Sequence, residues 1–343
     1  MKKNIIENKE KPLQVIDYDA IKKNAQFFRA LLGTSKLCAV LKNNAYGHGL
    51  THVARHIVEF IDCFAVGSCD EAEQIQFLNK DVLILLPQNL RNAERAIKAG
   101  FILTLDSFDT FEIIGQAAKN VGKSARVHLK IDSGMSRLGF NISQTDDLTA
   151  ALSGSKTLVE GVFSHFYGDS VTDCDKQFEY FNNCLNVLQK SINRPLIRHI
   201  ANTGATLLSD KYHLDMVRVG LGLYGYGNDG LLPAKKVYAD VIAAKSVHAG
   251  SVAGYGAIYK CEKDSEIAVI NVGYANGLAR RLVGSEIAIN GQKCAVVAIC
   301  MAMSLVDVTG LNVKSGDVAT VLGDGINISN NEVIIYELLC NLR

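Results

Sequence analysis

The chain has 343 residues, of which 48% are hydrophobic and 21% charged, and its formal net charge is +1. This length allows two domains, or one barrel with an appended domain, and the composition is ordinary for a globular protein. The small net charge argues against a large nucleic-acid-binding surface, and no apolar run approaches the roughly 20 residues that cross a bilayer. We therefore expect neither nucleic acid nor membrane as a partner.

The N-terminal segment and the cysteines bear on the cellular compartment. Residues 1–11 are polar and charged and lack the apolar segment of a signal peptide. The nine cysteines include no Cys-x-x-Cys pair, and their odd number fits free thiols better than a disulfide framework. These features predict a cytoplasmic protein without a metal site.

The first two-thirds of the chain alternates short β-rich runs with amphipathic helical stretches. Repeated strand–helix units of this length predict parallel strands with helical crossovers. Eight or so units over roughly 225 residues favour a (β/α)8 TIM-type barrel, with an open doubly wound sheet as the alternative. The expected strands are 13–16, 37–41, 63–66, 82–85, 102–104, 126–131, 158–163, 197–200 and 216–219, and the clearest helices are 19–32, 70–77, 91–99 and 175–189.

The composition changes after residue 230. The remainder is rich in Val, Ile and Gly and has few helical patterns, which predicts a mainly-β domain. We place the barrel at 1–230 and the β domain at 231–343. The expected strands there are 237–247, 267–272, 286–289, 295–299 and 318–321, followed by a helix over 331–339.

The most informative stretch is Leu37-Cys-Ala-Val-Leu-Lys42-Asn-Asn-Ala-Tyr46-Gly-His-Gly49, in which an apolar run ends in a lysine. A helical pattern begins near residue 50. A lysine at the end of a buried strand is costly to desolvate unless it is paired or chemically used. Burial also lowers the pKa of a lysine and makes its amine nucleophilic toward aldehydes. An ordinary strand end with an exposed lysine head is the alternative for a lone residue.

Other unusual side chains fall at expected strand ends, where barrel enzymes gather their functional groups. Lys130 and His199 lie on expected strands just before loops, His165 follows a strand, and Arg218 precedes a glycine-rich turn. Each alone fits a structural role, such as an ion pair or a packed core histidine. Their joint occurrence at the strand ends of one barrel favours a functional site.

These motifs together resemble the alanine racemase family. The resemblance spans roughly residues 11–340 and is carried by segments 11–24, 37–49, 129–139, 164–166, 199–203, 216–225, 255–257, 273–277 and 299–301. It implies a pyridoxal phosphate-dependent racemase with a (β/α)8 barrel and a C-terminal mainly-β domain.

The resemblance assigns the proton transfers to two residues. Lys42 would bond the cofactor aldehyde and act as a base on one face of the substrate, and Tyr255 of the partner subunit on the other. A free tyrosine has a pKa of about 10, so nearby cations must lower it, and Arg218, His165 and His199 are the expected ones. Arg218 would face the pyridine nitrogen. Because arginine keeps its proton, the ring stays a weak electron sink, which favours racemisation over transamination.

The remaining implied roles concern binding. The resemblance also implies a homodimer with shared active sites, because a barrel residue and a β-domain residue of different subunits must meet. The expected phosphate contacts are hydroxyl and backbone N–H groups, which suit an anion. Lys130 matches a lysine that is carbamylated in some members and positions an arginine. The implied cofactor-binding residues are Lys42, Tyr46, His165, Asn202, Thr203, Arg218, Gly220 and Leu221; the substrate-binding residues are Arg137, Met301 and Tyr274; and Lys130 and His199 stand behind them.

Three departures from the family pattern affect the expected pocket. Asn276 stands where the family has an aspartate, and Ala298 and Ala302 replace a base and an acid. The chain also stops at Arg343, before a tail that usually carries an aromatic residue near the phosphate. We expect these changes to alter substrate preference and cofactor affinity more than proton transfer.

The predicted function is the interconversion of L-alanine and D-alanine by two bases, which supplies D-alanine for peptidoglycan. One alternative is a serine or broad-specificity racemase. A second is a non-catalytic pyridoxal phosphate-binding homeostasis protein, which would lack the β domain and Tyr255. A third is a fold-related amino-acid decarboxylase, which the short chain and Arg218 disfavour.

Overall fold

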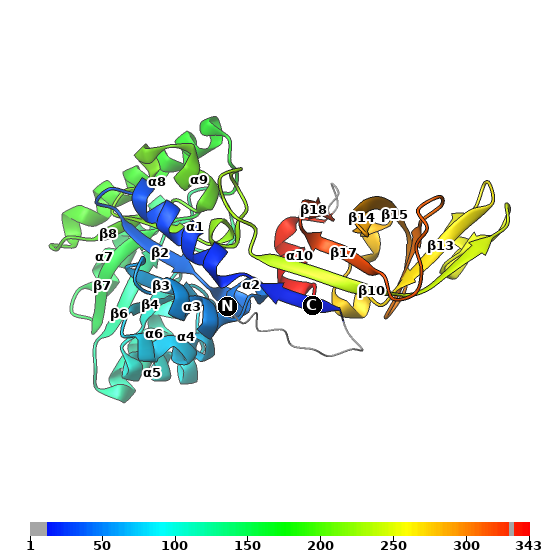
Figure 1. The fold of residues 1–343 in the computed structure, drawn as a ribbon. Helices are drawn as coiled ribbons and strands as arrows, with labels where there is room; N and C mark the ends of the chain where they lie inside the picture. Colours follow the sequence, from blue (N-terminus) through cyan, green and yellow to red (C-terminus); the bar gives the residue numbers. More distant parts are fainter. Residues whose placement is uncertain (1–11, 329–332) are drawn as a thin grey trace. The chain divides into compact units, whose positions relative to one another are not determined.

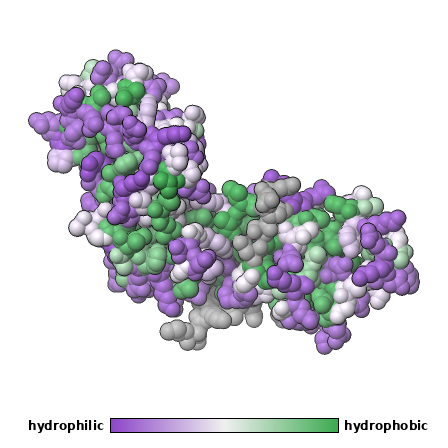
Figure 2. All heavy atoms as spheres, turned by 90° about the horizontal axis from the view of Figure 1, so that it is seen from above, coloured by the Kyte–Doolittle hydropathy of each residue, from purple (hydrophilic) through white to green (hydrophobic). Residues whose placement is uncertain are grey.

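The computed structural model describes residues 12–328 and 333–343, which form two compact units (Figure 1). The barrel unit comprises Tyr18–Ala45 and Gly49–Leu232. The β unit comprises the segment that ends at Asp17, together with Tyr46–His48 and Pro233–Arg343. In the part of the chain described, no helix is both long and apolar enough to span a bilayer. Hydrophilic and hydrophobic residues are interspersed on the face drawn in Figure 2.

The barrel unit contains eight parallel strands in the order β8-β7-β6-β5-β4-β3-β2-β9. Asp215 N donates to Arg198 O and Arg218 N donates to Ala201 O, so the two edge strands meet and the sheet nearly closes. The predicted barrel is therefore confirmed, and the open sheet is excluded. The strands are β2 (Lys36–Val40), β3 (Cys63–Val66), β4 (Asp81–Ile84), β5 (Ile102–Leu105), β6 (Ala125–Lys130), β7 (Thr157–Phe163), β8 (Ile197–His199) and β9 (Met216–Val219).

Helices connect the strands and lie around them (Figure 1). Their starts follow ordinary capping chemistry: Asn89, Ser107 and Ser170 each accept a hydrogen bond from a backbone N–H of the first turn. The helices are α1 (Tyr18–Leu31), α2 (Lys42–Gly47), α3 (Leu50–Ile57), α4 (Cys69–Ile75), α5 (Leu90–Ala99), α6 (Phe108–Val121), α7 (Thr145–Leu152), α8 (Val171–Ser191) and α9 (Thr203–Leu208).

Strand β1 (Leu13–Ile16) does not open the barrel, which corrects the expectation from the strand–helix pattern. It pairs antiparallel with β10 (Lys235–Val247), from Leu13 opposite Tyr238 to Ile16 opposite Lys235. The local pattern of a strand before a helix is real, but the partner of this strand lies far later in the chain. Sequence periodicity identifies the strand and carries no information about that partner.

The β unit contains an eight-stranded antiparallel sheet in the order β1-β10-β13-β16-β15-β14-β17-β18, and a two-stranded ribbon. Strand β10 also pairs with β17, so the sheet curls back on itself. Residues 331–332 of the expected last helix lie outside the described residues. The elements are β11 (Val252–Ala253), β12 (Tyr259–Lys260), β13 (Ser265–Ile270), β14 (Glu286–Ile289), β15 (Gln292–Ile299), β16 (Ser304–Asp307), β17 (Val318–Gly323), β18 (Ile326–Asn327) and α10 (Ile335–Asn341).

Candidate active site

Lys42 follows β2 almost directly, and the chain then makes a left-handed helical turn. Residues 43–46 all have φ of 53–54°, a conformation that costs non-glycine residues about 1–2 kcal/mol each. Asn44 ties the turn to its surroundings, since its N–H donates to the Glu71 carboxylate and its Oδ1 accepts from Leu50 N. Backbone strain of this kind persists only where the surrounding structure holds it, and it clusters at functional sites.

Arg218 of β9 lies inside the barrel, 4% exposed, among hydrogen-bond acceptors. Its Nη1 donates to Nδ1 of His199 over 2.8 Å, and its Nη2 donates to the carbonyl of Ser164 over 2.7 Å. Nδ1 of His165 lies 3.3 Å from Nη2, and the Phe163 ring centroid lies 5.2 Å from the guanidinium carbon. Burial lowers the pKa of Arg218 to about 10. The guanidinium is therefore still protonated at neutral pH.

His165 and His199 are neutral, which corrects the expectation that they act as cations. Burial disfavours the imidazolium form, and the charge of Arg218 adds repulsion, so the pKa of each lies well below its ordinary value. The positive charge at this end of the barrel comes instead from Arg218, Lys130 and Arg137.

His128, on β6, extends the contact of Arg218 with His199. Because Arg218 donates to Nδ1 of His199, that ring carries its hydrogen on Nε2 and donates to Nδ1 of His128 over 2.8 Å. Nε2 of His128 then carries a hydrogen, and it is buried without a partner among the described residues. His128 is not among the predicted site residues, although it and Lys130 are two residues apart on one strand and share a face.

Lys130 ends β6 and is almost fully buried, with its Nζ 5.1 Å from the Phe163 ring centroid. Burial, and then the charges of Arg218 and Arg137, lower the pKa of Lys130 to about 8. The loop that follows carries Arg137 at the surface. Within residues 12–328 and 333–343, the Arg137 side chain forms neither a hydrogen bond nor an ion pair.

Thr203, at the start of α9, lies against the turn that follows Arg218. Its Oγ1 accepts from the backbone N–H groups of Gly220 and Gly222, each over 3.2 Å, and donates no hydrogen bond within the described residues. Leu221 begins the single turn after β9. Asn202 caps α9 through its side-chain oxygen. The Gly220 and Gly222 N–H groups are thus directed at the Thr203 hydroxyl, which has a hydrogen of its own to donate to an anion.

Tyr46 groups with the β unit, where its ring centroid lies 5.8 Å from that of Tyr336. The Tyr46 side chain is buried, and burial raises its phenol pKa above the ordinary value. Nearby, the fully buried Lys235 donates from Nζ to the carbonyl of Leu339 over 2.8 Å, at the C-terminal end of α10. A cation at this end of a helix is favourable. Lys235 is not among the residues predicted from the sequence.

The other three predicted residues lie on the β unit and are exposed. Tyr255 begins a short turn and is 82% exposed, while Tyr274 and Met301 are 44% and 61% exposed. The turn at Tyr255 needs glycine before it, because Gly254 has φ +79° and a Cβ there would lie 2.6 Å from the Cβ of Ala298. The departure at position 298 therefore lies beside the backbone of Tyr255.

The barrel site has a lysine and a buried arginine at the C-terminal ends of neighbouring strands, and the Thr203 hydroxyl beside the turn after β9. This set suits a barrel enzyme that binds a phosphorylated aldehyde cofactor. Two protein-family models match the chain: the alanine racemase N-terminal domain over residues 16–228 and the alanine racemase C-terminal domain over residues 234–343. The chain belongs to the alanine racemase family.

Individual relatives cover nearly the whole chain. Alanine racemase 1 of Oceanobacillus iheyensis is 32% identical over 95% of this chain and 94% of its own length. The alanine racemase of Salinispora tropica is 35% identical, over 90% and 88%. The alanine racemase structure from D-cycloserine-producing Streptomyces lavendulae has a TM-score of 0.90 at 28% identity, over 98% of this chain and 96% of that chain. The structure from Bartonella henselae, which has covalently bound pyridoxal phosphate, has a TM-score of 0.87 at 26% identity, over 97% of each chain.

Membership of this family confirms the predicted enzyme class, the racemase activity and the pyridoxal phosphate cofactor. The match to the C-terminal domain excludes a stand-alone barrel. The residues present also fit the cofactor, because Lys42 offers an amine for an aldehyde, Arg218 a donor for a ring nitrogen, and Thr203 a donor for a phosphate.

Proposed function

We propose that the protein interconverts L-alanine and D-alanine in the cytoplasm and so supplies D-alanine for peptidoglycan. The observation that carries the proposal is Arg218, a buried and protonated guanidinium at the same end of the barrel as Lys42. A transaminase needs an acid at the ring nitrogen, whereas simple loss and return of the α-proton does not.

The barrel residues divide the work of binding. Pyridoxal phosphate, when bound, draws electrons from the α-carbon of an attached amino acid and so acidifies its α-proton. Lys42 would hold the aldehyde, and Thr203 with the N–H groups of Gly220 and Leu221 would hold the phosphate. Arg218 would donate a hydrogen bond to the ring nitrogen and, because it keeps its own proton, would not protonate it. An unprotonated ring would be a weaker electron sink, which would restrain side reactions.

Two groups carry the α-proton, one on each face of the substrate. Nζ of Lys42 takes or returns the proton on one face, and Oη of Tyr255 does so on the other. Enantiomers interconvert when one group removes the proton and the other returns it.

We propose further that the active form is a homodimer, with the β domain starting near residue 230. Tyr255 of the partner subunit would complete the barrel site, and its exposure in a single chain supports this arrangement. The substrate carboxylate would bind Arg137 and the backbone at Met301. Tyr274 would line the entrance.

Chiral analysis of the products in D2O tests the function, with pyridoxal phosphate added and L-alanine and L-serine supplied separately. Formation of α-deuterated D-alanine with little D-serine is the expected result. Comparable amounts of D-serine would change the assignment to a serine or broad-specificity racemase. No exchange with either amino acid, despite bound cofactor, would overturn the proposal.

A further inference from the structure

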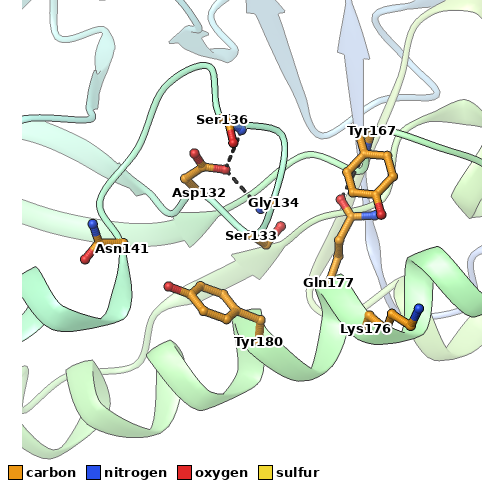
Figure 3. Close-up of a pocket in the computed structure, with 9 residues that line it drawn as sticks. All are labelled: Asp132, Ser133, Gly134, Ser136, Asn141, Tyr167, Lys176, Gln177 and Tyr180. Atoms are coloured by element: carbon orange, nitrogen blue, oxygen red, sulfur yellow. Dashed lines mark hydrogen bonds between the residues drawn. The ribbon is translucent and has the colours of Figure 1, made fainter.

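A cavity of about 480 Å³ lies on the barrel unit between the loop after β6 and helix α8 (Figure 3). The loop on one side of this cavity carries Arg137, and Tyr167 lines the other side. We propose that Tyr167 and Ser164 clamp this loop, residues 132–139, and so position Arg137 to bind the substrate carboxylate. The role of Arg137 in this statement rests on the proposed function.

The loop has to be held through its backbone, because the Arg137 side chain has no hydrogen bond or ion pair of its own in the described structure. At the base, Asp132 N donates to Phe140 O and Phe140 N donates to Lys130 O, each over 2.9 Å. Above the base, Oδ1 of Asp132 accepts from Gly134 N and Ser136 N, each over 3.0 Å. These contacts close the loop internally but do not attach its tip to the barrel.

The tip contains a strained residue directly before Arg137. Gly134 has φ +129°, which glycine adopts readily, whereas Ser136 has φ +55° and is held within the loop only through its N–H. A serine in the left-handed region persists only where neighbouring structure holds it. The position of Arg137 therefore depends on what packs against the tip.

Tyr167 supplies that packing. A Cβ built on Gly134 would lie 3.5 Å from Cε1 of Tyr167 and 3.7 Å from Cγ of Gln177, so one edge of the ring faces the backbone of the tip. The backbone N–H of Tyr167 donates to Oε1 of Gln177 over 3.2 Å, and its Oη donates to Asp173 over 3.4 Å. Gln177 is buried and donates in turn to the backbone of Asp173 on α8. Figure 3 shows Tyr167 and Gln177 together beside the loop.

Ser164 holds the base of the same loop from the end of β7. Its hydroxyl donates to Ile131 O over 2.7 Å, so it accepts the hydroxyl hydrogen of Ser133 over 2.6 Å. The carbonyl of Ser164 accepts from Arg218. Residues 164–167 thus contact both the buried arginine and the loop with the exposed one. A shift of this segment would change the spacing of the two arginines.

Hydrogen–deuterium exchange of the holoenzyme tests the clamp without any use of activity. In Tyr167→Ala we expect the amides of residues 132–139 to exchange at least about tenfold faster, because the packing on Gly134 is lost. Tyr167→Phe keeps the ring and should exchange nearly as the wild type does. Tyr180→Phe is the matched control, because Tyr180 lines the same cavity but contacts Ile142. Unchanged exchange of this loop in Tyr167→Ala would overturn the clamp.

Kinetics test the consequence for Arg137. Tyr167→Ala should raise both KM for alanine and the inhibition constant of propionate by about tenfold, with kcat within about threefold, since only carboxylate binding is weakened. Tyr167→Phe should restore both constants, and Tyr167→Ala should add little in an Arg137→Lys background. A fall in kcat with both constants unchanged would overturn the positioning role.

Two further controls keep the outcomes distinct. If Tyr167→Ala fails to fold, Ser133→Ala decides, because it loosens the same loop from its base and should show the same faster exchange. Wild-type exchange in the loop of that variant would count against the clamp. If the wild-type protein does not racemise alanine, the proposed function fails while the exchange result still stands.

Discussion

Nη1 of Arg218 donates to Nδ1 of His199 over 2.8 Å, and this contact determines where the hydrogens lie on two buried histidines. A guanidinium can only donate, so His199 must accept at Nδ1 and donate at Nε2 to His128. Three strands of the barrel are joined in this way. The orientation of Arg218 therefore depends on side chains of two other strands, β8 and β6.

His199→Leu should destabilise the protein by about 2–3 kcal/mol, because it leaves a buried charged N–H of Arg218 without an acceptor. His199→Asn places an oxygen near the position of Nδ1 and should recover part of the loss. Urea denaturation and kcat/KM for alanine measure both effects. Equal losses in the two variants would show that the contact with Arg218 is not what matters.

Much of the barrel site follows from position alone. Parallel strand–helix units are local in sequence, so the strand ends that carry Lys42, Arg218 and Thr203 can be placed before the structure is known. The left-handed turn after Lys42 has a weaker signal, the pair Asn43-Asn44, since asparagine tolerates positive φ better than most residues. The asparagine pair predicts a turn with positive φ, but it does not predict that all four residues 43–46 adopt this conformation.

The unpredicted contacts depend on register and on packing between elements. His128 lies opposite Gly161 on β7, and a Cβ on that glycine would lie 2.8 Å from the His128 ring. Neither residue alone indicates a histidine buried against a glycine. The role proposed for Tyr167 likewise depends on its position beside Gly134, which belongs to another loop. The pairing of β1 with β10 was unpredictable for the same reason.

Acid pH should weaken the fold through the buried histidines. Burial lowers the pKa of His128 to about 3, whereas the unfolded chain has an ordinary value of about 6.5. Below pH 6.5 the unfolded state binds a proton that the folded state excludes, so stability is full above pH 6.5 and declines as the pH falls toward 3. From pH 6.5 to 5.0 this amounts to about 2 kcal/mol for His128 alone.

Urea denaturation at pH 7.5, 6.0 and 5.0 measures this decline. His128→Gln lacks the titrating ring, so its free energy of unfolding should fall about 2 kcal/mol less than that of the wild type over this range. Parallel curves for the two proteins would show that His128 does not stay neutral in the folded state.

Lys42→Ala should abolish the imine between the protein and its cofactor, which borohydride reduces to a stable amine in the wild type. In the wild type, mass spectrometry after reduction should find the pyridoxyl group on the peptide that contains Lys42. Lys130→Ala is the matched control, because it removes another lysine of the same barrel end and should leave that peptide labelled. Label on a different lysine in the wild type would refute the assignment.

Lys130 should react with carbon dioxide more readily than a surface lysine. With a pKa of about 8, half of its amines are neutral at pH 8, against roughly 0.3% for an ordinary lysine. The neutral amine adds carbon dioxide and releases a proton, and the resulting carbamate anion would offset the charges of Arg137 and Arg218. A carbamate signal in ¹³C NMR with labelled bicarbonate, absent in Lys130→Ala, is the expected result. The same signal in both proteins would place it elsewhere.

Tyr255→Phe should separate the two proton transfers. The variant removes only Oη, and at an 82% exposed position the free energy of unfolding should change by no more than about 0.5 kcal/mol.

Because the two enantiomers have equal free energy, the rate of net racemisation must fall equally in both directions. That rate therefore cannot show which face has lost its base. Deuterium uptake into the unreacted substrate does show this, because it measures proton removal from each enantiomer separately. The enantiomer whose α-proton faces Lys42 should still exchange with retention of configuration, while exchange of the other falls by about 10²–10⁴-fold. Tyr274→Phe should leave the two exchange rates in their wild-type ratio. Equal loss of exchange from L-alanine and D-alanine in Tyr255→Phe would mean that Tyr255 does not act as the base of one face.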